Sequence, residues 1–148
     1  MLKLPVLHPE ILQALAAAGH ASRVVITDGN YPHITRPNPR AKFVWANYLP
    51  GVLDAVTALR VVCRCVPIEA AHVMQPDRDG EWARSEEPPI WEQFRRVLRD
   101  EAGFASPLIP KFKPEFNELA AAPETCLVIA TGETAIWANI LVTIGVVV

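Results

Sequence analysis

The sequence predicts a single α/β domain of 148 residues, in which helices flank a largely parallel sheet. Two observations lead to this prediction. Amphipathic helical segments alternate with short segments that are apolar throughout, and strands buried in parallel sheets read as continuous apolar runs. The composition, 51% hydrophobic and 20% charged, is that of a globular chain long enough to bury a sizeable core.

The chain opens with a predicted helix and strand. Pro9 suits the first helical position, and Gly19 can end the helix in a left-handed conformation. A β-branched strand is expected over residues 23–27, directly after His20. Turn chemistry follows at Asp28, so this carboxylate is placed where the strand ends.

The middle of the chain is expected to alternate between loops, a helix and strands. Prolines and basic residues predict an irregular exposed loop over residues 32–42. The expected elements that follow are a helix over 50–59, strands over 61–66 and 71–74, and a charged loop over 75–87.

The last third is expected to hold two helices and two strands. A helix opens after Pro88 or Pro89, and its apolar residues recur at helical spacing. A short helix around residues 114–120 precedes an apolar strand over 125–130. The segment 140–148 is too short to span a membrane and reads as a buried strand, or as one shared with a neighbouring subunit.

Charge and targeting signals exclude several classes of protein. A net charge of −2 and a pI near 6.1 give no reason to expect binding to nucleic acid or to an anionic membrane. The first ten residues lack the apolar core of a signal peptide. Three cysteines do not form a disulfide framework, so a reducing cytoplasm is the expected location.

Metal, cofactor and nucleophile motifs are not evident in the sequence. Cys63 and Cys65 would share a face of a strand, but no second pair stands at zinc-site spacing, so buried thiols are the preferred interpretation. His72 is expected to be a satisfied histidine in the core or an interface. The glycines form no phosphate-binding pattern, and no serine has a nucleophile context. We therefore expect no metal and no cofactor.

His20 and Asp28 remain as a candidate acid/base pair on either side of one strand. Histidine titrates near neutral pH, and a carboxylate can fix its tautomer. The extended strand separates the two groups by about 20 Å, at about 3.3 Å per residue. They can meet only through a loop that folds back or across a subunit interface.

Several motifs resemble the RbsD/FucU family of sugar mutarotases, which comprises D-ribose pyranases and L-fucose mutarotases. They are Gly19-His20 before a strand, Asp28 at its end, and Thr131-Gly132-Glu133 followed by Trp137, Asn139 and Gly145-Val146. The resemblance extends from Leu2 to Val146, and the TGE motif with its downstream asparagine is its most specific part.

The resemblance implies an RbsD-like layered fold assembled as a homo-oligomer of pentameric rings, often paired as decamers, with active sites at subunit interfaces. It implies catalytic roles for His20 and Asp28 and substrate contacts for Asn139. Lys113 stands where the ribose branch has histidine and the fucose branch has arginine. Trp137 replaces a tyrosine of the family, offering an N–H and a larger apolar face in place of a phenol.

The implied function is cofactor-free interconversion of monosaccharide anomers or ring forms. The segment 70–74 and the helical region 92–99 look closer to the fucose-type members, so an L-fucose mutarotase is the preferred reading. The alternatives are a D-ribose pyranase and a sugar-binding or transport-accessory protein without turnover. A third alternative is an assembly protein that binds no ligand.

Overall fold

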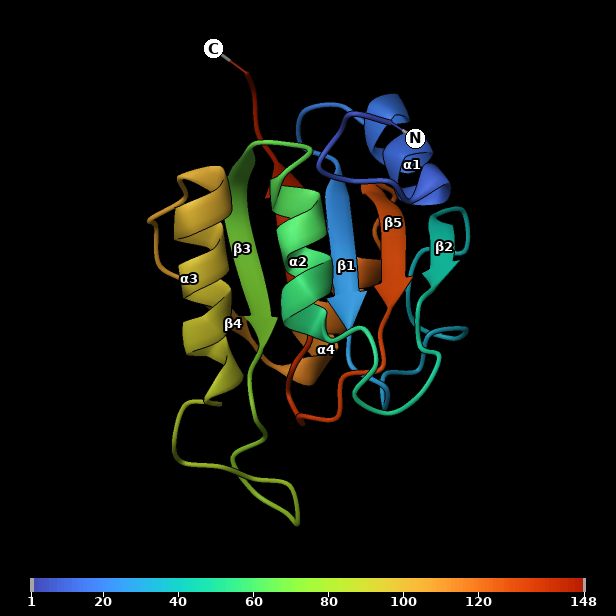
Figure 1. Cartoon of the computed structure of the whole chain (residues 1–148). Coiled ribbons are helices and arrows are strands. Elements are labelled where there is room, and N and C mark those ends of the chain that lie inside the picture. Colours follow the sequence, from blue (N-terminus) through green and yellow to red (C-terminus); the bar gives the residue numbers. More distant parts are fainter. Residues whose placement is uncertain (1, 148) are drawn as a thin grey trace.

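The computed structural model describes residues 2–147 as one six-stranded sheet with helices on both faces (Figure 1). The strand order is β2-β5-β1-β6-β3-β4, and β6 alone runs against the others. The largely parallel α/β fold predicted from the sequence is confirmed. The strands are β1 (Arg23–Thr27), β2 (Lys42–Trp45), β3 (Ile68–Met74), β4 (Ile109–Lys111), β5 (Thr125–Ala130) and β6 (Ile140–Ile144).

Three helices cover one face of the sheet and a fourth covers the other (Figure 1). They are α1 (Pro9–Ala17), α2 (Ala55–Cys63) and α3 (Ile90–Ala102) on the first face and α4 (Lys113–Ala121) on the second. Alternation along the strands divides the core accordingly. In β1, Val24 and Ile26 pack under the three helices, whereas Val25 packs with Phe116 of α4. None of the helices of residues 2–147 has the length and apolar character needed to cross a membrane.

Two elements in the middle of the chain differ from the sequence prediction. The helix predicted over 50–59 begins only at Ala55, because Asp54 Oδ1 accepts the Thr57 N–H at 2.6 Å and caps it there. The strand predicted over 61–66 is wrong, since residues 61–63 continue α2. A short apolar run fits a strand or a buried helix equally well. Here the run extends the buried face of α2, so it is helical.

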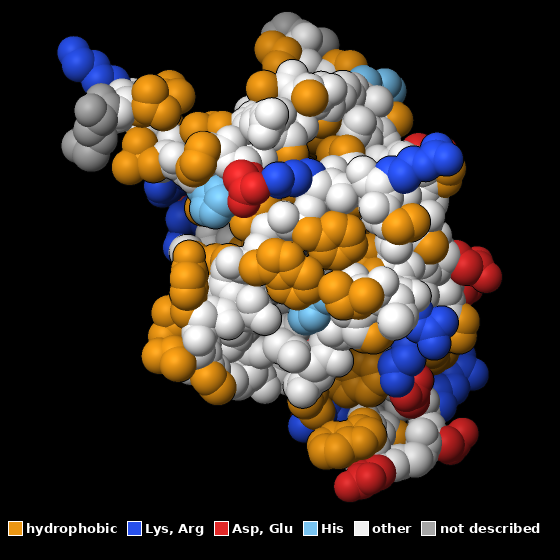
Figure 2. All heavy atoms as spheres, turned by 90° about the vertical axis from the view of Figure 1, so that its right-hand side faces the viewer, with side chains coloured by type: hydrophobic (Ala, Val, Ile, Leu, Met, Phe, Trp, Pro, Cys, Tyr) orange, Lys and Arg blue, Asp and Glu red, His pale blue; other side chains and the backbone are white. Residues whose placement is uncertain are grey.

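The two edge strands of the sheet, β2 and β4, were not predicted from the sequence. Within residues 2–147, β2 pairs only with β5, and β4 pairs only with β3. Short edge strands bury little and therefore carry a weak apolar pattern, and β4 also contains Pro110. Figure 2 shows the face that carries β2, where a group of apolar side chains lies beside a histidine. The ring of Trp45, the last residue of β2, lies 5.7 Å from the ring of His33.

The final strand lies inside the sheet. β6 pairs with β1 on one side and β3 on the other, so neither of its edges is left for a neighbouring subunit. It ends at Ile144, and the last residue of the predicted segment, Val148, lies outside the described residues. Its reversed direction brings the residue before it, Asn139, to the edge of the sheet where β1 ends.

Gly132 allows the loop after β5 to contact the backbone of the loop before α2 directly. Its N–H donates to the Leu53 carbonyl at 3.0 Å, and its own carbonyl accepts the Gly51 N–H at 2.6 Å. A Cβ atom at residue 132 would meet the carbonyl oxygens of Leu49 and Val52 at 2.3 and 2.4 Å. These oxygens belong to the backbone and cannot rotate away, so the position requires glycine.

We predict that Gly132→Ala lowers the free energy of unfolding by at least about 2 kcal/mol, because the added methyl group forces the two loops apart. Urea denaturation measures the loss. Gly19→Ala is the matched control, since a Cβ atom there meets nothing within 4 Å. Equal stability of the two variants would contradict this contact.

Candidate functional site

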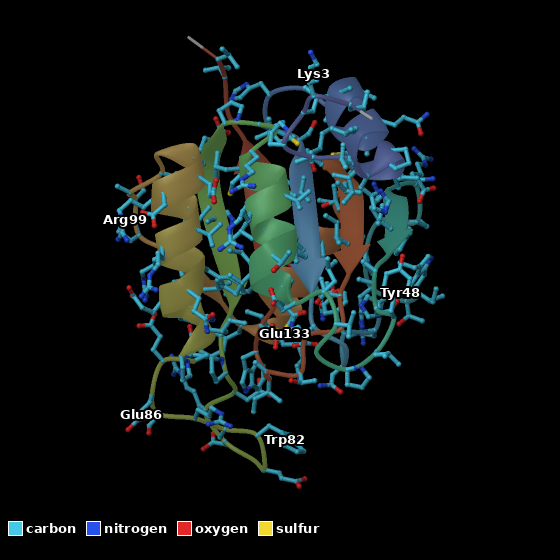
Figure 3. All side chains as sticks on the ribbon, viewed as in Figure 1. Lys3, Tyr48, Trp82, Glu86, Arg99 and Glu133 are labelled. Carbon is cyan, nitrogen blue, oxygen red and sulfur yellow. The ribbon has the colours of Figure 1, made fainter. Side chains whose placement is uncertain are left out.

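A cavity of about 360 Å³ opens beyond the carboxyl-terminal ends of β1, β3 and β5. Its walls come from the loop after β1, the long loop after β3, the start of α4 and the segment before β6. Figure 3 shows Trp82 on the long loop, beyond the ends of the strands. The lining residues are Asp28, Asn30, Tyr31, Trp82, Lys113, Ile136, Trp137 and Asn139.

Asp28 and Asn139 form a reciprocal clamp at the base of this cavity. The Asn139 amide Nδ2 donates to Asp28 Oδ2 at 2.8 Å, and the Asp28 backbone N–H donates to Asn139 Oδ1 at 3.0 Å. The Asn30 backbone N–H donates to the other carboxylate oxygen, also at 3.0 Å. The carboxylate is thus held in one orientation, with acceptor positions still available toward the cavity.

Burial sets the protonation behaviour of Asp28. The residue is only 3% exposed, and this desolvation raises the pKa of its carboxyl above the usual value of 3.8. Hydrogen bonds from Asn30 and Asn139 act in the opposite direction, because they favour the charged form. Tyr31, in the same cavity, also has its pKa raised by burial, and its hydroxyl donates to Asn117 Oδ1 at 3.0 Å. It therefore remains a neutral phenol.

The TGE motif builds the platform under the cavity. The Thr131 hydroxyl donates to the Thr27 carbonyl at 2.7 Å, and the Glu133 carbonyl accepts the Gly29 N–H at 2.9 Å. The Glu133 carboxylate accepts the backbone N–H groups of Ala135 and Ala55, at 2.8 and 3.3 Å. Glu133 lies near the start of α2 (Figure 3), where the helix dipole also favours its charge. The motif positions Asp28 without lining the cavity.

Trp137 holds the long loop over the cavity. Its indole Nε1 donates to the Trp82 carbonyl at 3.2 Å, so its only polar hydrogen is engaged with protein. Its backbone is left-handed, with φ of +63°, and its carbonyl accepts the Trp91 indole N–H at 3.4 Å. Trp91 is thus buried, whereas Trp82 is 59% exposed.

Lys113 supplies the positive charge of the site from the first turn of α4. Its Nζ lies 5.3 Å from the centre of the Trp137 ring, within range of a cation–π contact. Asp77 of the long loop lies 3.5 Å from the same nitrogen. Since the ammonium is half exposed, it can exchange this partner for a hydroxyl group of a ligand.

The structure brings together four of the five predicted site residues, Asp28, Lys113, Trp137 and Asn139. His20 is not part of the cavity lining, because it precedes β1 whereas Asp28 follows it. Its Nε2 lies 2.8 Å from Glu69 Oε2, at the end of the strands opposite to the cavity. His20 and Asp28 therefore lie at opposite ends of β1 within the chain, as the sequence predicts.

Four cavity residues were missed from the sequence: Asn30, Tyr31, Trp82 and Ile136. Asn30 and Tyr31 follow Asp28 directly, and the turn that ends the strand was a usable signal for both. Trp82 lies in a charged loop with no periodicity. Only the folded path of that loop places its indole at the cavity.

The cysteines and His72 differ from the sequence prediction in detail. Cys63 ends α2 and Cys65 follows it, so they do not share a strand. Burial raises the pKa of Cys63 to about 12, which keeps it a thiol, and no cluster of metal-ligating side chains occurs among residues 2–147. His72 lies on β3 as expected, but its Nδ1 is buried and has no hydrogen-bond partner among those residues, so it is not satisfied. Its pKa is lowered, first by burial.

Comparison with known proteins identifies the family of this chain and relatives that share its fold. The profile of the RbsD / FucU transport protein family matches residues 1–147.

The chain belongs to the RbsD/FucU family.

Among curated family members, the fucose mutarotase of Homo sapiens is 33% identical over 142 residues, which is 95% of this chain and 89% of that protein. The structure of the Streptococcus pneumoniae fucose mutarotase in complex with L-fucose superposes with a TM-score of 0.82 at 22% identity, over all of both chains. Bacillus subtilis RbsD complexed with D-ribose gives a TM-score of 0.78 at 18% identity, also over all of both chains. The two structures confirm the RbsD-like fold.

We predict that Trp137→Phe releases the long loop, because the variant keeps the aromatic wall and loses the N–H that reaches the Trp82 carbonyl. Loss of one such bond corresponds to about 1 kcal/mol, or roughly fivefold faster local opening. Hydrogen exchange of residues 76–87, measured by mass spectrometry, reports it. Trp45→Phe, on the exposed edge strand, is the control, and unchanged exchange in Trp137→Phe would contradict the latch.

We predict that the Asp28 carboxyl titrates above pH 3.8 in the folded protein, as measured by ¹³C NMR of its Cγ atom. From pH 3.8 up to the raised pKa, the folded state holds this proton more tightly than the unfolded chain. Asp28 therefore lowers the free energy of unfolding as pH rises through that window. Asn139→Ala removes an interaction that favours the charged form and should move the midpoint further up. A midpoint at or below 3.8 would contradict this description.

Proposed function

We propose that the protein is a cofactor-free monosaccharide mutarotase that acts on L-fucose or a sugar of the same shape. One observation carries this proposal: a fixed, buried carboxylate–amide pair lies at the base of a cavity of about 360 Å³, with aromatic walls and a lysine at its rim. Convergent hydroxyl partners beside apolar ring faces are what a pyranose requires. The fucose mutarotases among its relatives support the choice of sugar.

The reaction needs two proton movements and no other reactant. A base takes the proton from the anomeric hydroxyl while an acid protonates the ring oxygen. The bond between the anomeric carbon and the ring oxygen breaks, and an aldehyde forms. Rotation about the adjacent carbon–carbon bond and ring closure give the other anomer, with both protons returned. Because mutarotation proceeds slowly in water, groups that each contribute about 10²–10⁴-fold are sufficient.

Five of the eight residues that line the cavity have a role in this proposal. Asp28 accepts a sugar hydroxyl or guides the proton, and Asn139 keeps it oriented. Lys113 donates to a hydroxyl oxygen, and the indoles of Trp137 and Trp82 face the apolar side of the sugar ring. The Trp137 N–H already binds the Trp82 carbonyl, so Trp137 acts as a wall and not as an acid.

His20 is the proposed proton-transfer group, and it reaches the cavity of a neighbouring protomer. We infer a homo-oligomer of pentameric rings, which can pair as a decamer. His20 and Asp28 lie at opposite ends of β1, so they can share one site only if they come from two chains. Exposed apolar side chains near the N-terminus and after β6 support self-association. Free cysteines support the proposed cytoplasmic location.

A second candidate function is sugar binding without turnover, and one observation favours it. Trp137 cannot supply the phenolic hydroxyl that the family usually has at this position, and its N–H is occupied. Tyr31 does bring a phenol to the cavity, although its proton is directed at Asn117. D-Ribose pyranase activity remains the alternative among catalytic functions.

We predict that the protein accelerates exchange between the anomers of L-fucose, measured by saturation-transfer NMR on the equilibrated sugar. D-Ribose, followed through its pyranose and furanose signals, tests the pyranase alternative. His20→Ala should reduce the acceleration about 10²-fold or more. Asp28→Asn should do the same, because the amide cannot take up the proton.

Lys113→Ala should mainly raise the sugar concentration needed for half-maximal rate, with Lys3→Ala as its control. Sugar binding in calorimetry without acceleration of either sugar would establish the binding function instead. Acceleration that survives His20→Ala in an intact oligomer would remove His20 from its proposed role.

A further inference from the structure

Among residues 2–147, the cavity lining holds one hydroxyl group, and it belongs to Tyr31. The side chain is buried, with only 5% of the residue exposed. Trp137, in the same lining, has its single polar hydrogen bonded to the Trp82 carbonyl and offers none to a ligand. The phenol of Tyr31 is therefore a polar group of the cavity that the proposed reaction does not use.

The side chain of Tyr31 connects the turn after β1 with α4. The Tyr31 N–H donates to the Asp28 carbonyl at 3.4 Å, and the phenol hydroxyl donates to Asn117 Oδ1 at 3.0 Å. Asn117 follows Lys113 by four residues, and helical residues at this spacing lie on the same face. The hydroxyl thus lies against the face of α4 that carries the ammonium group of the site.

Packing fixes the position of the Tyr31 ring. The ring contacts Phe116 of α4 edge to face, with ring centres 6.4 Å apart and an interplanar angle of 75°. His33 makes a second edge contact, at 5.8 Å and 68°. Both contacts involve the rings alone, so a phenylalanine at residue 31 keeps them. Removal of the hydroxyl therefore tests what the oxygen does without emptying the core.

The phenol oxygen of Tyr31 is available as a hydrogen-bond acceptor. A phenol donates one hydrogen bond, and its oxygen can accept another. Asn117 takes the proton, and no group of residues 2–147 donates to the oxygen in return. Burial raises the pKa of Tyr31, so the phenol keeps this proton. What Tyr31 can offer a ligand is an acceptor of fixed position.

We propose that Tyr31 determines sugar specificity: its phenol oxygen accepts a hydrogen bond from a ring hydroxyl other than the anomeric one. The proposal rests on the proposed function, which assigns the anomeric proton transfers to His20 and Asp28. Asn117 acts through Tyr31 as a positioning residue, because it holds the phenol proton and leaves the oxygen free to accept. Lys113 on the same wall can only donate. This wall therefore selects a sugar with a hydroxyl group at this place over the corresponding deoxy sugar.

Calorimetry with L-fucose is the first test, and Tyr48→Phe is the matched control. Tyr48 is the other tyrosine of the chain, is 75% exposed, and does not line the cavity. Tyr31→Phe should raise Kd about fivefold, the effect of one neutral hydrogen bond, whereas Tyr48→Phe should leave Kd unchanged. Equal Kd in Tyr31→Phe and in the wild type would overturn the proposal.

Deoxy sugars show whether the phenol oxygen binds a hydroxyl group directly. The 2-, 3- and 4-deoxy forms of L-fucose each lack one ring hydroxyl. For one of them, the loss of affinity relative to L-fucose should be about fivefold smaller in Tyr31→Phe than in the wild type, because the variant has no partner for that hydroxyl. A merely structural role of Tyr31 would weaken all four sugars alike. The same losses in both proteins would overturn the proposal.

A second cycle tests the positioning role of Asn117. Asn117→Ala should weaken L-fucose binding in the wild-type background and have no further effect in the Tyr31→Phe background, since it acts only through the phenol. The same loss of affinity in both backgrounds would overturn this role.

Kinetics separate the proposal from the proposed function. Tyr31→Phe should raise KM for anomer exchange about fivefold while kcat stays within about twofold, because the lost contact is made equally before and during the reaction. Unchanged KM would overturn the proposal and leave the mutarotase function standing. Binding that depends on Tyr31 without acceleration in the wild type would refute turnover and support the proposal. If the wild type binds neither L-fucose nor D-ribose, the proposed function is refuted and this proposal with it.

Discussion

The clamp between Asp28 and Asn139 is the interaction on which the site depends. It joins the end of β1 to the residue before β6, positions 111 apart in the chain, through two hydrogen bonds of 2.8 and 3.0 Å. It can form only because β6 runs antiparallel between β1 and β3, which brings the start of one strand to the end of another. A buried carboxylate is costly unless its oxygens are occupied, and here the fold supplies the partners.

The sequence was sufficient for the main architecture and for half of the residues that line the cavity. Apolar strands and capped helices predict an α/β sheet, and Asp28, Lys113, Trp137 and Asn139 do converge. The failures have physical causes. The edge strands β2 and β4 bury too little to leave a pattern, and residues 61–63 fit a strand or a buried helix until burial of α2 decides. The path of the loop that places Trp82 depends on tertiary contacts alone.

Trp137 serves as a wall of the cavity and as a fastening for the loop above it. Its indole N–H fastens the loop that carries Trp82, and its ring lies under the ammonium of Lys113. A phenol in its place would offer a proton to a ligand, whereas the indole offers a wall. We therefore assign the proposed proton transfers to His20 and Asp28. These two residues lie at opposite ends of β1. We propose a site shared between protomers because it would bring these two residues together.

Mixing inactive protomers tests this shared site most directly. His20→Ala and Asp28→Asn oligomers would be dissociated, combined in equal amounts, reassembled and assayed for L-fucose anomer exchange. If His20 of one protomer serves Asp28 of another, random assembly restores about a quarter of the wild-type rate, because both intact residues meet in that share of the sites. If both residues serve the same protomer, no mixed site is intact. A mixture as inactive as its two components would contradict the account.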